Sequence, residues 1–118
     1  MLLAKGQGAS PGQAEGPLAL TSEAALAFAE RGTPAIFVRN EMDAADVPAI
    51  RASAGVIIAR GGITADGAVA ARALGKPCIV GCSGVVISQS SLRAGASMLL
   101  EGARLAIDGA AGTIETRD

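Results

Sequence analysis

Gly61-Gly62-Ile63-Thr64-Ala65-Asp66-Gly67-Ala68-Val69-Ala70-Ala71-Arg72 is the stretch of sequence that decides the fold. It follows Gly55–Ala59, an apolar run with the length and composition of a buried strand. The paired glycines predict a turn, and the alanine-rich segment after them predicts a helix that Thr64 caps and that ends before Gly75. The stretch therefore predicts a strand, a glycine turn and a helix in succession.

The same alternation of strand and helix continues on both sides of this stretch. Upstream, a helix that Thr21 or Ser22 caps should run to about Glu30, and Asp43 with Asp46 resembles an acidic capping box that starts a helix through Arg51. Turn residues at Gly6–Gly12 predict an irregular entry segment. The remaining apolar runs predict strands at Glu15–Leu20, Ala35–Val38, Pro77–Val80, Val85–Ile87, Ser97–Leu100, Arg104–Ile107 and Gly112–Glu115.

These elements predict a single α/β domain over residues 1–118. Three strand–helix alternations followed by short strands alone favour a mixed sheet with parallel and antiparallel pairing. The chain has no linker and no internal repeat, and its 118 residues suffice for one core. That core must be built mainly from small aliphatic side chains, because Phe28 and Phe37 are the only aromatic residues.

Composition excludes several classes of partner. The net charge is −1 with no basic stripe and no aromatic platform, so we expect no nucleic acid. No apolar run approaches the length of a membrane span, so we expect no membrane partner. Cys78 and Cys82 lack the spacing of a redox pair and the further ligands of a zinc site, which indicates reduced thiols in a cytoplasmic protein.

The glycine turn has the features of an anion site. Gly61 and Gly62 would let a phosphate approach the backbone, and the helix that follows would supply unpaired N–H donors. Each neighbouring polar residue also has a purely structural explanation. Thr64 can be an N-cap, Asp66 can stabilise the positive end of the helix, and Arg72 can stabilise its negative end.

The chain resembles the mobile phosphohistidine domain of phosphoenolpyruvate-utilising enzymes, most closely the central domain of pyruvate phosphate dikinase. Residues Gly61–Gly81 match a family motif of the form G-G-x-T-S-H-A-A-V-x-A-R-x-x-G-x-P-C-V-x-G. The likeness covers nearly the whole chain, from Ser10-Pro11-Gly12 through Val38-Arg39-Asn40-Glu41 to Asp108–Ile114. The resemblance implies a swivelling β/β/α domain that carries a phosphoryl group between an ATP-grasp domain and a pyruvate-binding barrel.

The resemblance also implies where the chemistry is changed. Asp66 stands where the family's motif has the phosphorylated histidine, Ala65 replaces a serine and Gly67 an alanine, and the chain contains no histidine at all. Gly61, Gly62, Thr64 and Arg72 match the residues of the phosphate-binding loop and its helix. The ATP-grasp domain and the barrel of pyruvate phosphate dikinase and phosphoenolpyruvate synthase are absent from this sequence, which leaves enzymatic activity of its own open.

An aspartate could carry an acyl phosphate, but its chemistry differs from that of a histidine. The carboxylate has a shorter reach, and its charge repels an incoming phosphate unless a cation such as Mg²⁺ intervenes. Glu41 and Asp43 follow the strand next to the one that precedes Asp66, so Glu41, Asp43 and Asp66 could together hold Mg²⁺. The alternative is that Asp43 caps its helix and Glu41 faces solvent.

Three functions follow as hypotheses. The first is a stand-alone docking or regulatory partner of a phosphoryl-transfer enzyme, either an ATP-grasp or a phosphoenolpyruvate-binding enzyme. The second is a phosphotransferase component that carries an acyl phosphate on Asp66. The third is a phosphate- or anion-binding module that uses the Gly61-Gly62-Ile63-Thr64 loop.

Overall fold

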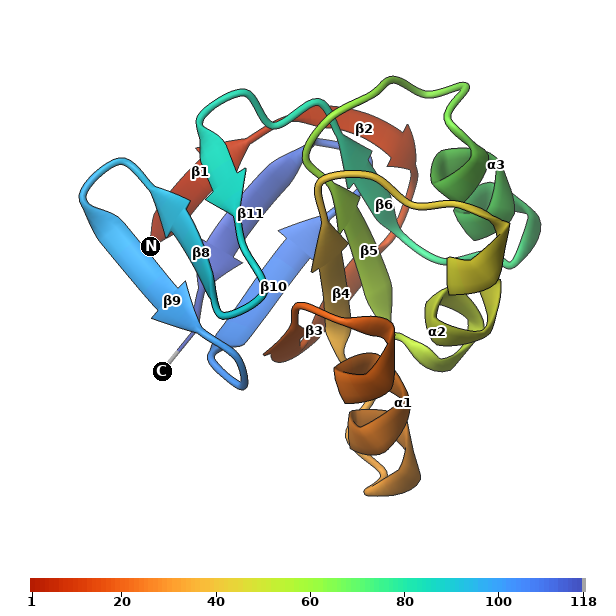
Figure 1. The fold of residues 1–118 in the computed structure, drawn as a ribbon. Coiled ribbons are helices and arrows are strands. Elements are labelled where there is room, and N and C mark those ends of the chain that lie inside the picture. The colour runs from red at the N-terminus through yellow and green to blue at the C-terminus, as the bar shows by residue number, and fades with distance from the viewer. Residues whose placement is uncertain (118) are drawn as a thin grey trace.

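The computed structural model describes residues 1–117, and within that range a mixed eight-stranded sheet is the central layer (Figure 1). Its strand order is β1-β11-β10-β3-β4-β5-β6-β2, and a separate three-stranded sheet has the order β7-β8-β9. The strands are β1 (Leu2–Lys5), β2 (Gln7–Ser10), β3 (Gln13–Ala19), β4 (Ile36–Arg39), β5 (Gly55–Ile58), β6 (Cys78–Val80), β7 (Val85–Ile87), β8 (Ser91–Ala94), β9 (Ser97–Leu100), β10 (Arg104–Asp108) and β11 (Thr113–Thr116). The helices are α1 (Ser22–Glu30), a short 3₁₀ helix η1 (Ala44–Asp46), α2 (Val47–Ala52) and α3 (Asp66–Ala73).

The predicted mixed α/β fold is confirmed. Strands β3, β4, β5 and β6 pair in parallel, and the other neighbours in the large sheet are antiparallel. The parallel strands follow one another in chain order, so each connection crosses in the same sense and places its helix on the same face. Figure 1 shows α1, α2 and α3 together on that face.

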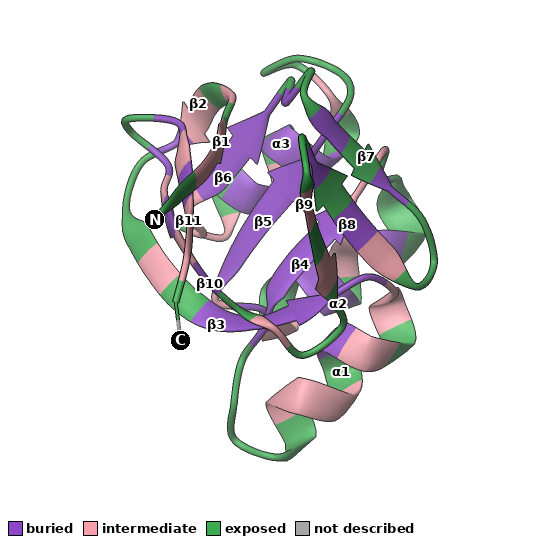
Figure 2. Ribbon diagram, turned by 90° about the vertical axis from the view of Figure 1, so that its left-hand side faces the viewer, coloured by how far each residue is buried: buried purple, intermediate pink, exposed green. Residues whose placement is uncertain are grey.

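Two apolar clusters fill the two faces of the sheet, which explains the run of hydrophobic residues in each parallel strand. In β4, Phe37 packs with the helices, whereas Ile36 and Val38 pack with the cluster that includes Val85 and Leu92 of the small sheet. Figure 2 shows the parallel strands buried between the helical layer and the small sheet. The layers are therefore helices, large sheet and small sheet.

Neither of the first two strands was predicted; β2 falls within Gly6–Gly12, which is rich in glycine and polar residues and was expected to be irregular. The structure corrects this expectation: β1 pairs with β11 and β2 pairs with β6, at opposite ends of the strand order. Since only Gly6 separates β1 from β2, the sheet curls until its two ends meet. The Gly6 N–H closes the junction by donating to the Gly112 carbonyl at 2.8 Å.

The predicted N-caps Thr21 and Asp43 are confirmed, and the predicted N-cap Thr64 is wrong. Thr21 caps α1, its hydroxyl accepting from the Ala24 N–H at 3.1 Å. Asp43 and Asp46 form the expected reciprocal capping box, although the first turn is 3₁₀ before α2 begins. Thr64 does not cap α3: the N-cap is Ala65, whose own N–H donates to the Gly62 carbonyl at 3.0 Å in a preceding turn. That turn delays the helix by one residue.

The turn between β10 and β11 makes stability depend on pH. The Asp108 carboxylate accepts from the N–H groups of Ala111 and Ala110 at 3.0 and 2.9 Å, and these bonds lower the pKa of Asp108 below 3.8. Because the folded pKa is the lower one, the stabilisation is complete above the unfolded pKa and is lost as the pH falls through the folded pKa.

We therefore expect Asp108→Asn to destabilise the protein near neutral pH and to lose that effect progressively as the pH falls through the acid range. Urea unfolding of both proteins at neutral pH and at a series of acid pH values measures this difference. A difference in unfolding free energy that stays the same at every pH would contradict the assignment.

Candidate functional site

The loop that follows β5 leaves the large sheet as an exposed turn. Gly61 has a φ of 94°, a conformation that favours glycine, and Gly61, Gly62, Ile63 and Thr64 are all exposed. A Cβ at Gly62 would meet nothing within 4 Å, so space is open above this part of the loop. The loop thus presents its backbone to solvent.

Asp66 is the first residue of α3 and is exposed. Its carboxylate lies in the first turn, where the positive end of the helix favours an anion. Two apolar side chains near it are also exposed, Ile63 to 43% and Val69 to 49%. Val69 is three residues from Asp66 and so lies on the same face of the helix. We call Ile63, Thr64, Asp66 and Val69 the loop face.

Gly67 anchors the loop face to the core. A Cβ at this position would lie 2.7 Å from Ile58 Cδ1 and 2.9 Å from Met42 Cβ. The helix therefore approaches β5 and the Met42 segment more closely than an alanine would allow. Gly67 stands where the family motif has an alanine, and this close approach explains the glycine physically.

Arg72 lies in the last turn of α3, as predicted, but it contacts a strand. Its Nη1 donates to the Ala9 carbonyl of β2 at 3.2 Å. Thr64, in contrast, makes no side-chain hydrogen bond within the described residues. The structure thus gives Arg72 a role in joining the helix to the sheet and leaves the Thr64 hydroxyl free on the loop face.

Glu41, Asp43 and Asp66 are not assembled as a metal site. Within residues 1–117, no three His, Cys, Asp or Glu side chains lie in an arrangement that could hold a metal ion. Asp43 Oδ1 instead accepts from the Ala45 N–H at 2.9 Å, and Glu41 is exposed. The edge of the sheet brings the loops together, but the capping box turns the Asp43 carboxylate toward its own helix.

A polar cleft of about 510 Å³ was not predicted from the sequence. It lies where three parallel strands end, beside the loop face. Its walls come from four separate segments, which contribute Leu20, Thr21, Glu23, Arg39, Asn40, Glu41, Arg60, Ile87, Ser88 and Gln89. Arg39 is the last residue of β4, and Arg60 immediately precedes Gly61. Their charge alone did not distinguish them from the other basic residues of the sequence. We call this the strand-end cleft.

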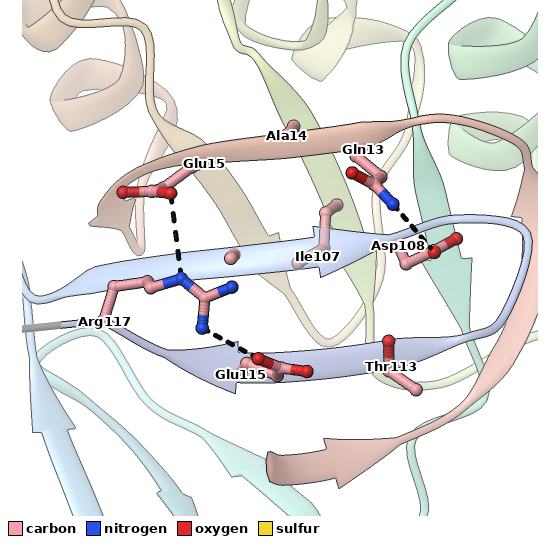
Figure 3. A pocket seen from close by; sticks show the side chains of 9 residues that line it. Gln13, Ala14, Glu15, Ile107, Asp108, Thr113, Glu115 and Arg117 are labelled. Atoms are coloured by element: carbon pink, nitrogen blue, oxygen red, sulfur yellow. Dashed lines mark hydrogen bonds and ion pairs between the residues drawn. The ribbon is translucent and has the colours of Figure 1, made fainter. Parts of the chain in front are cut away.

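A second hollow, of about 310 Å³, lies on the outer face of β3, β10 and β11 (Figure 3). Ala106 is paired with both Glu15 and Glu115, and its small side chain leaves the space between them. Arg117 lies between the two glutamates in Figure 3, with Nη1 2.8 Å from Glu115 and Nε 3.8 Å from Glu15. Arg117 therefore offsets part of the negative charge that Glu15, Asp108 and Glu115 bring to this hollow, which is separate from the loop face.

The two thiols are buried, free and unreactive. Burial raises the pKa of Cys78 to about 12 and that of Cys82 to about 11. Neither forms a useful population of thiolate near neutral pH, which argues against redox or nucleophilic chemistry. In the part of the chain that the structure describes, no helix is both long and apolar enough to cross a membrane.

Comparison with known proteins places this geometry in context. A family model described as PEP-utilising enzyme, mobile domain, matches residues 30–112. Pyruvate, phosphate dikinase 2 of Zea mays is 37% identical over 115 residues, which cover 96% of this chain and 13% of the maize protein. Pyruvate, phosphate dikinase 1, chloroplastic, of Arabidopsis thaliana is 38% identical over 115 residues, with 96% and 12% covered. The chain thus spans only about an eighth of the length of these curated relatives.

A solved structure shares the fold across the full chain. The holo form of aconitase X from Thermococcus kodakaraensis superposes with a TM-score of 0.55 at 17% sequence identity, covering 98% of each chain. At this identity the likeness establishes the architecture alone.

Proposed function

The chain belongs to the family of phosphoenolpyruvate-utilising enzyme mobile domains, and from that premise we propose that it is a docking or regulatory domain for a phosphoryl-transfer enzyme. In this proposal the domain enters the partner's active-site mouth through the loop face without carrying a phosphoryl group. The observation that carries the proposal is the loop face itself: exposed Ile63 and Val69 flank an exposed carboxylate at Asp66.

The chemistry of position 66 supports docking over transfer. The chain contains no histidine, so an imidazole relay is excluded. An aspartyl phosphate requires a cation to offset the repulsion between the carboxylate and the incoming phosphate. Within residues 1–117, Asp66 does not belong to any group of three His, Cys, Asp or Glu side chains that could hold one. The surface for contact is present, whereas support for acyl-phosphate chemistry is not.

Apolar side chains give the loop face its affinity in this proposal. Ile63 and Val69 together would bury aliphatic surface on docking. A partner that has evolved to receive a phosphorylated mobile domain presents cationic groups at that site. The Asp66 carboxylate supplies one negative charge where the phosphoryl group would bring about two.

Val69→Glu should abolish docking while leaving the fold intact, because Val69 is half exposed on the surface of α3. We expect binding to fall at least about tenfold, since docking would bury the new charge beside Asp66. The measurement is photo-crosslinking from Ile63 in lysate of the source organism, with captured proteins identified by mass spectrometry. Capture of an ATP-grasp or phosphoenolpyruvate-binding enzyme, lost in Val69→Glu, is the expected result.

Val86→Glu is the matched control. Val86 is 65% exposed on the small sheet, so the same substitution adds the same charge to a different exposed valine. Capture should be unchanged in that variant. Capture that survives Val69→Glu, or that returns neither class of enzyme, would contradict docking through the loop face.

A further inference from the structure

We propose that the strand-end cleft binds a small organic anion, a phosphate or carboxylate that also carries hydroxyl or amino groups. Its volume of about 510 Å³ is in the range of ligand pockets in proteins. This inference is independent of docking, because none of its lining residues belongs to the loop face. Its support comes from the position, the construction and the unpaired charges of the cleft.

The position is one where α/β folds commonly bind ligands. Thr21, Arg39 and Arg60 follow or end β3, β4 and β5, and the loops after parallel strands leave from the same edge of the sheet. In many folds of this class a reversal of the strand order opens a crevice at that edge. Here the strands run in unbroken order, and the segment after β7 supplies the second wall of the cleft.

That second wall is fixed by hydrogen bonds. Asn40 Nδ2 donates to the Ile87 carbonyl at 3.1 Å and so ties the end of β7 to the loop after β4. Beyond Ile87, the Ser88 hydroxyl accepts from the N–H groups of Ser90 and Ser91 at 3.2 and 3.0 Å. The cleft is therefore bounded by two segments that are held at a defined separation, with Leu20 and Ile87 as its apolar lining.

Arg60 supplies a cation that forms no ion pair within the described residues. Its side chain is exposed and makes no ion pair within residues 1–117, although its backbone N–H is held by the Asn40 carbonyl at 2.9 Å. A guanidinium with its donors unused at the mouth of a cleft is suited to a phosphate or a carboxylate, which it can bind through two parallel hydrogen bonds.

Arg39 supplies the second cation, and its guanidinium forms one ion pair. Its Nη1 lies 3.7 Å from Asp46 Oδ1, and that carboxylate is itself held by the Ser22 hydroxyl at 2.8 Å and the Asp43 N–H at 3.0 Å. The Asp46 carboxylate therefore shares its charge among several donors and restrains Arg39 without saturating its five N–H groups. Arg39 and Arg60 both line the cleft, so two guanidinium groups are available to one ligand.

The remaining polar lining determines what else the ligand must carry. Glu23 and Glu41 line the same cleft and make no ion pair within the described residues. These acceptors favour a ligand that brings hydroxyl or amino donors beside its anionic group. Inorganic phosphate lacks such a body, so a phosphorylated polyol is the better probe.

The test is a titration of the isotope-labelled protein with glycerol 3-phosphate, followed by nuclear magnetic resonance. We expect saturable shifts of the backbone amides of Asn40, Arg60 and Ser88, and no shifts with glycerol at the same concentrations. Arg60→Gln should weaken binding roughly tenfold to a hundredfold, the expected loss for a charge-assisted hydrogen-bonded pair. Arg117→Gln, which makes the same change in the hollow of Figure 3, should bind as the unaltered protein does.

Three results would overturn the proposal. The first is the absence of saturable shifts. The second is a set of shifts confined to Gly61–Asp66, which would place the anion on the loop instead of in the cleft. The third is binding that Arg60→Gln leaves unchanged. The variant itself should fold, because Arg60 is exposed and only its backbone is hydrogen-bonded.

Discussion

Gly109→Ala is expected to destabilise the protein by more than about 3 kcal/mol, which can exceed half of the stability of a small domain. A Cβ at this position would lie 1.9 Å from the Ser10 carbonyl oxygen and 3.0 Å from the Cys78 backbone nitrogen. Both atoms are backbone, so no side chain can rotate away. Gly109 does not have a positive φ, and the expected cost is therefore steric.

The clash falls where the sheet closes on itself. Ser10 and Cys78 are paired between β2 and β6, and the Gly109 N–H donates to the Gly12 carbonyl at 2.7 Å. To admit a methyl group, the β10–β11 turn must separate from β2, which exposes the junction that Gly6 makes with Gly112. Urea unfolding measures the cost. Gly84→Ala is the matched control, because a Cβ there meets nothing within 4 Å and should change stability by less than about 0.5 kcal/mol.

A loss of less than about 1 kcal/mol in Gly109→Ala would mean that the turn is not packed against β2 as the structure describes.

Asp66→His is expected to accept a radiolabelled phosphoryl group that the unaltered protein does not accept. The histidine variant restores an imidazole at the exposed start of α3, with the loop glycines and Thr64 unchanged. In source lysate that supplies partners, radiolabelled phosphoenolpyruvate or ATP should transfer its phosphoryl group to this variant. Asp66→Asn should remain unlabelled, since an amide is not a useful nucleophile.

Failure of the histidine variant to take up label would contradict the proposal that the loop face still reaches a phosphoryl-transfer site. The Val69→Glu substitution placed in the same histidine variant gives a second check. It should prevent labelling by preventing docking, while leaving the unfolding curve close to that of the single variant.

The central strands and helices could be predicted because their signals are local. Ile36–Val38 and Val56–Ile58 are continuous apolar runs between turn residues, and their burial on both faces is what such runs indicate. Thr21 and Asp43 cap helices through bonds that span only two or three residues. Each of these features is decided within a short window of sequence.

The missed elements depend on partners that are distant in sequence. Strand β2 contains only small and polar residues, and it is a strand because β6 lies beside it, about seventy residues later. Strand β8 follows Ser88–Ser90, a polar run that reads as a loop until its pairing with β7 and β9 is seen. Intrinsic propensity could not have revealed either strand.

The candidate site also contains features that a local stretch of sequence indicates and features that depend on residues distant in sequence. Gly61, Thr64 and Asp66 belong to one contiguous motif, so the sequence alone could single them out. The strand-end cleft did not, because Arg39, Arg60 and Ser88 come from segments that only the sheet brings together. The proposed metal cluster of Glu41, Asp43 and Asp66 shows the limit of arguing from a shared edge: neighbouring loops do not determine where their side chains point.

The most direct test of the central claim is the phosphorylation state of the unaltered protein. After incubation with phosphoenolpyruvate or ATP in source lysate, the recovered protein is analysed by intact mass and by peptide mapping, before and after hydroxylamine. We expect no phosphoryl group at Asp66, together with recovery of an ATP-grasp or phosphoenolpyruvate-binding partner. A phosphoryl group mapped to Asp66 and removed by hydroxylamine would contradict it and would establish an acyl-phosphate carrier instead.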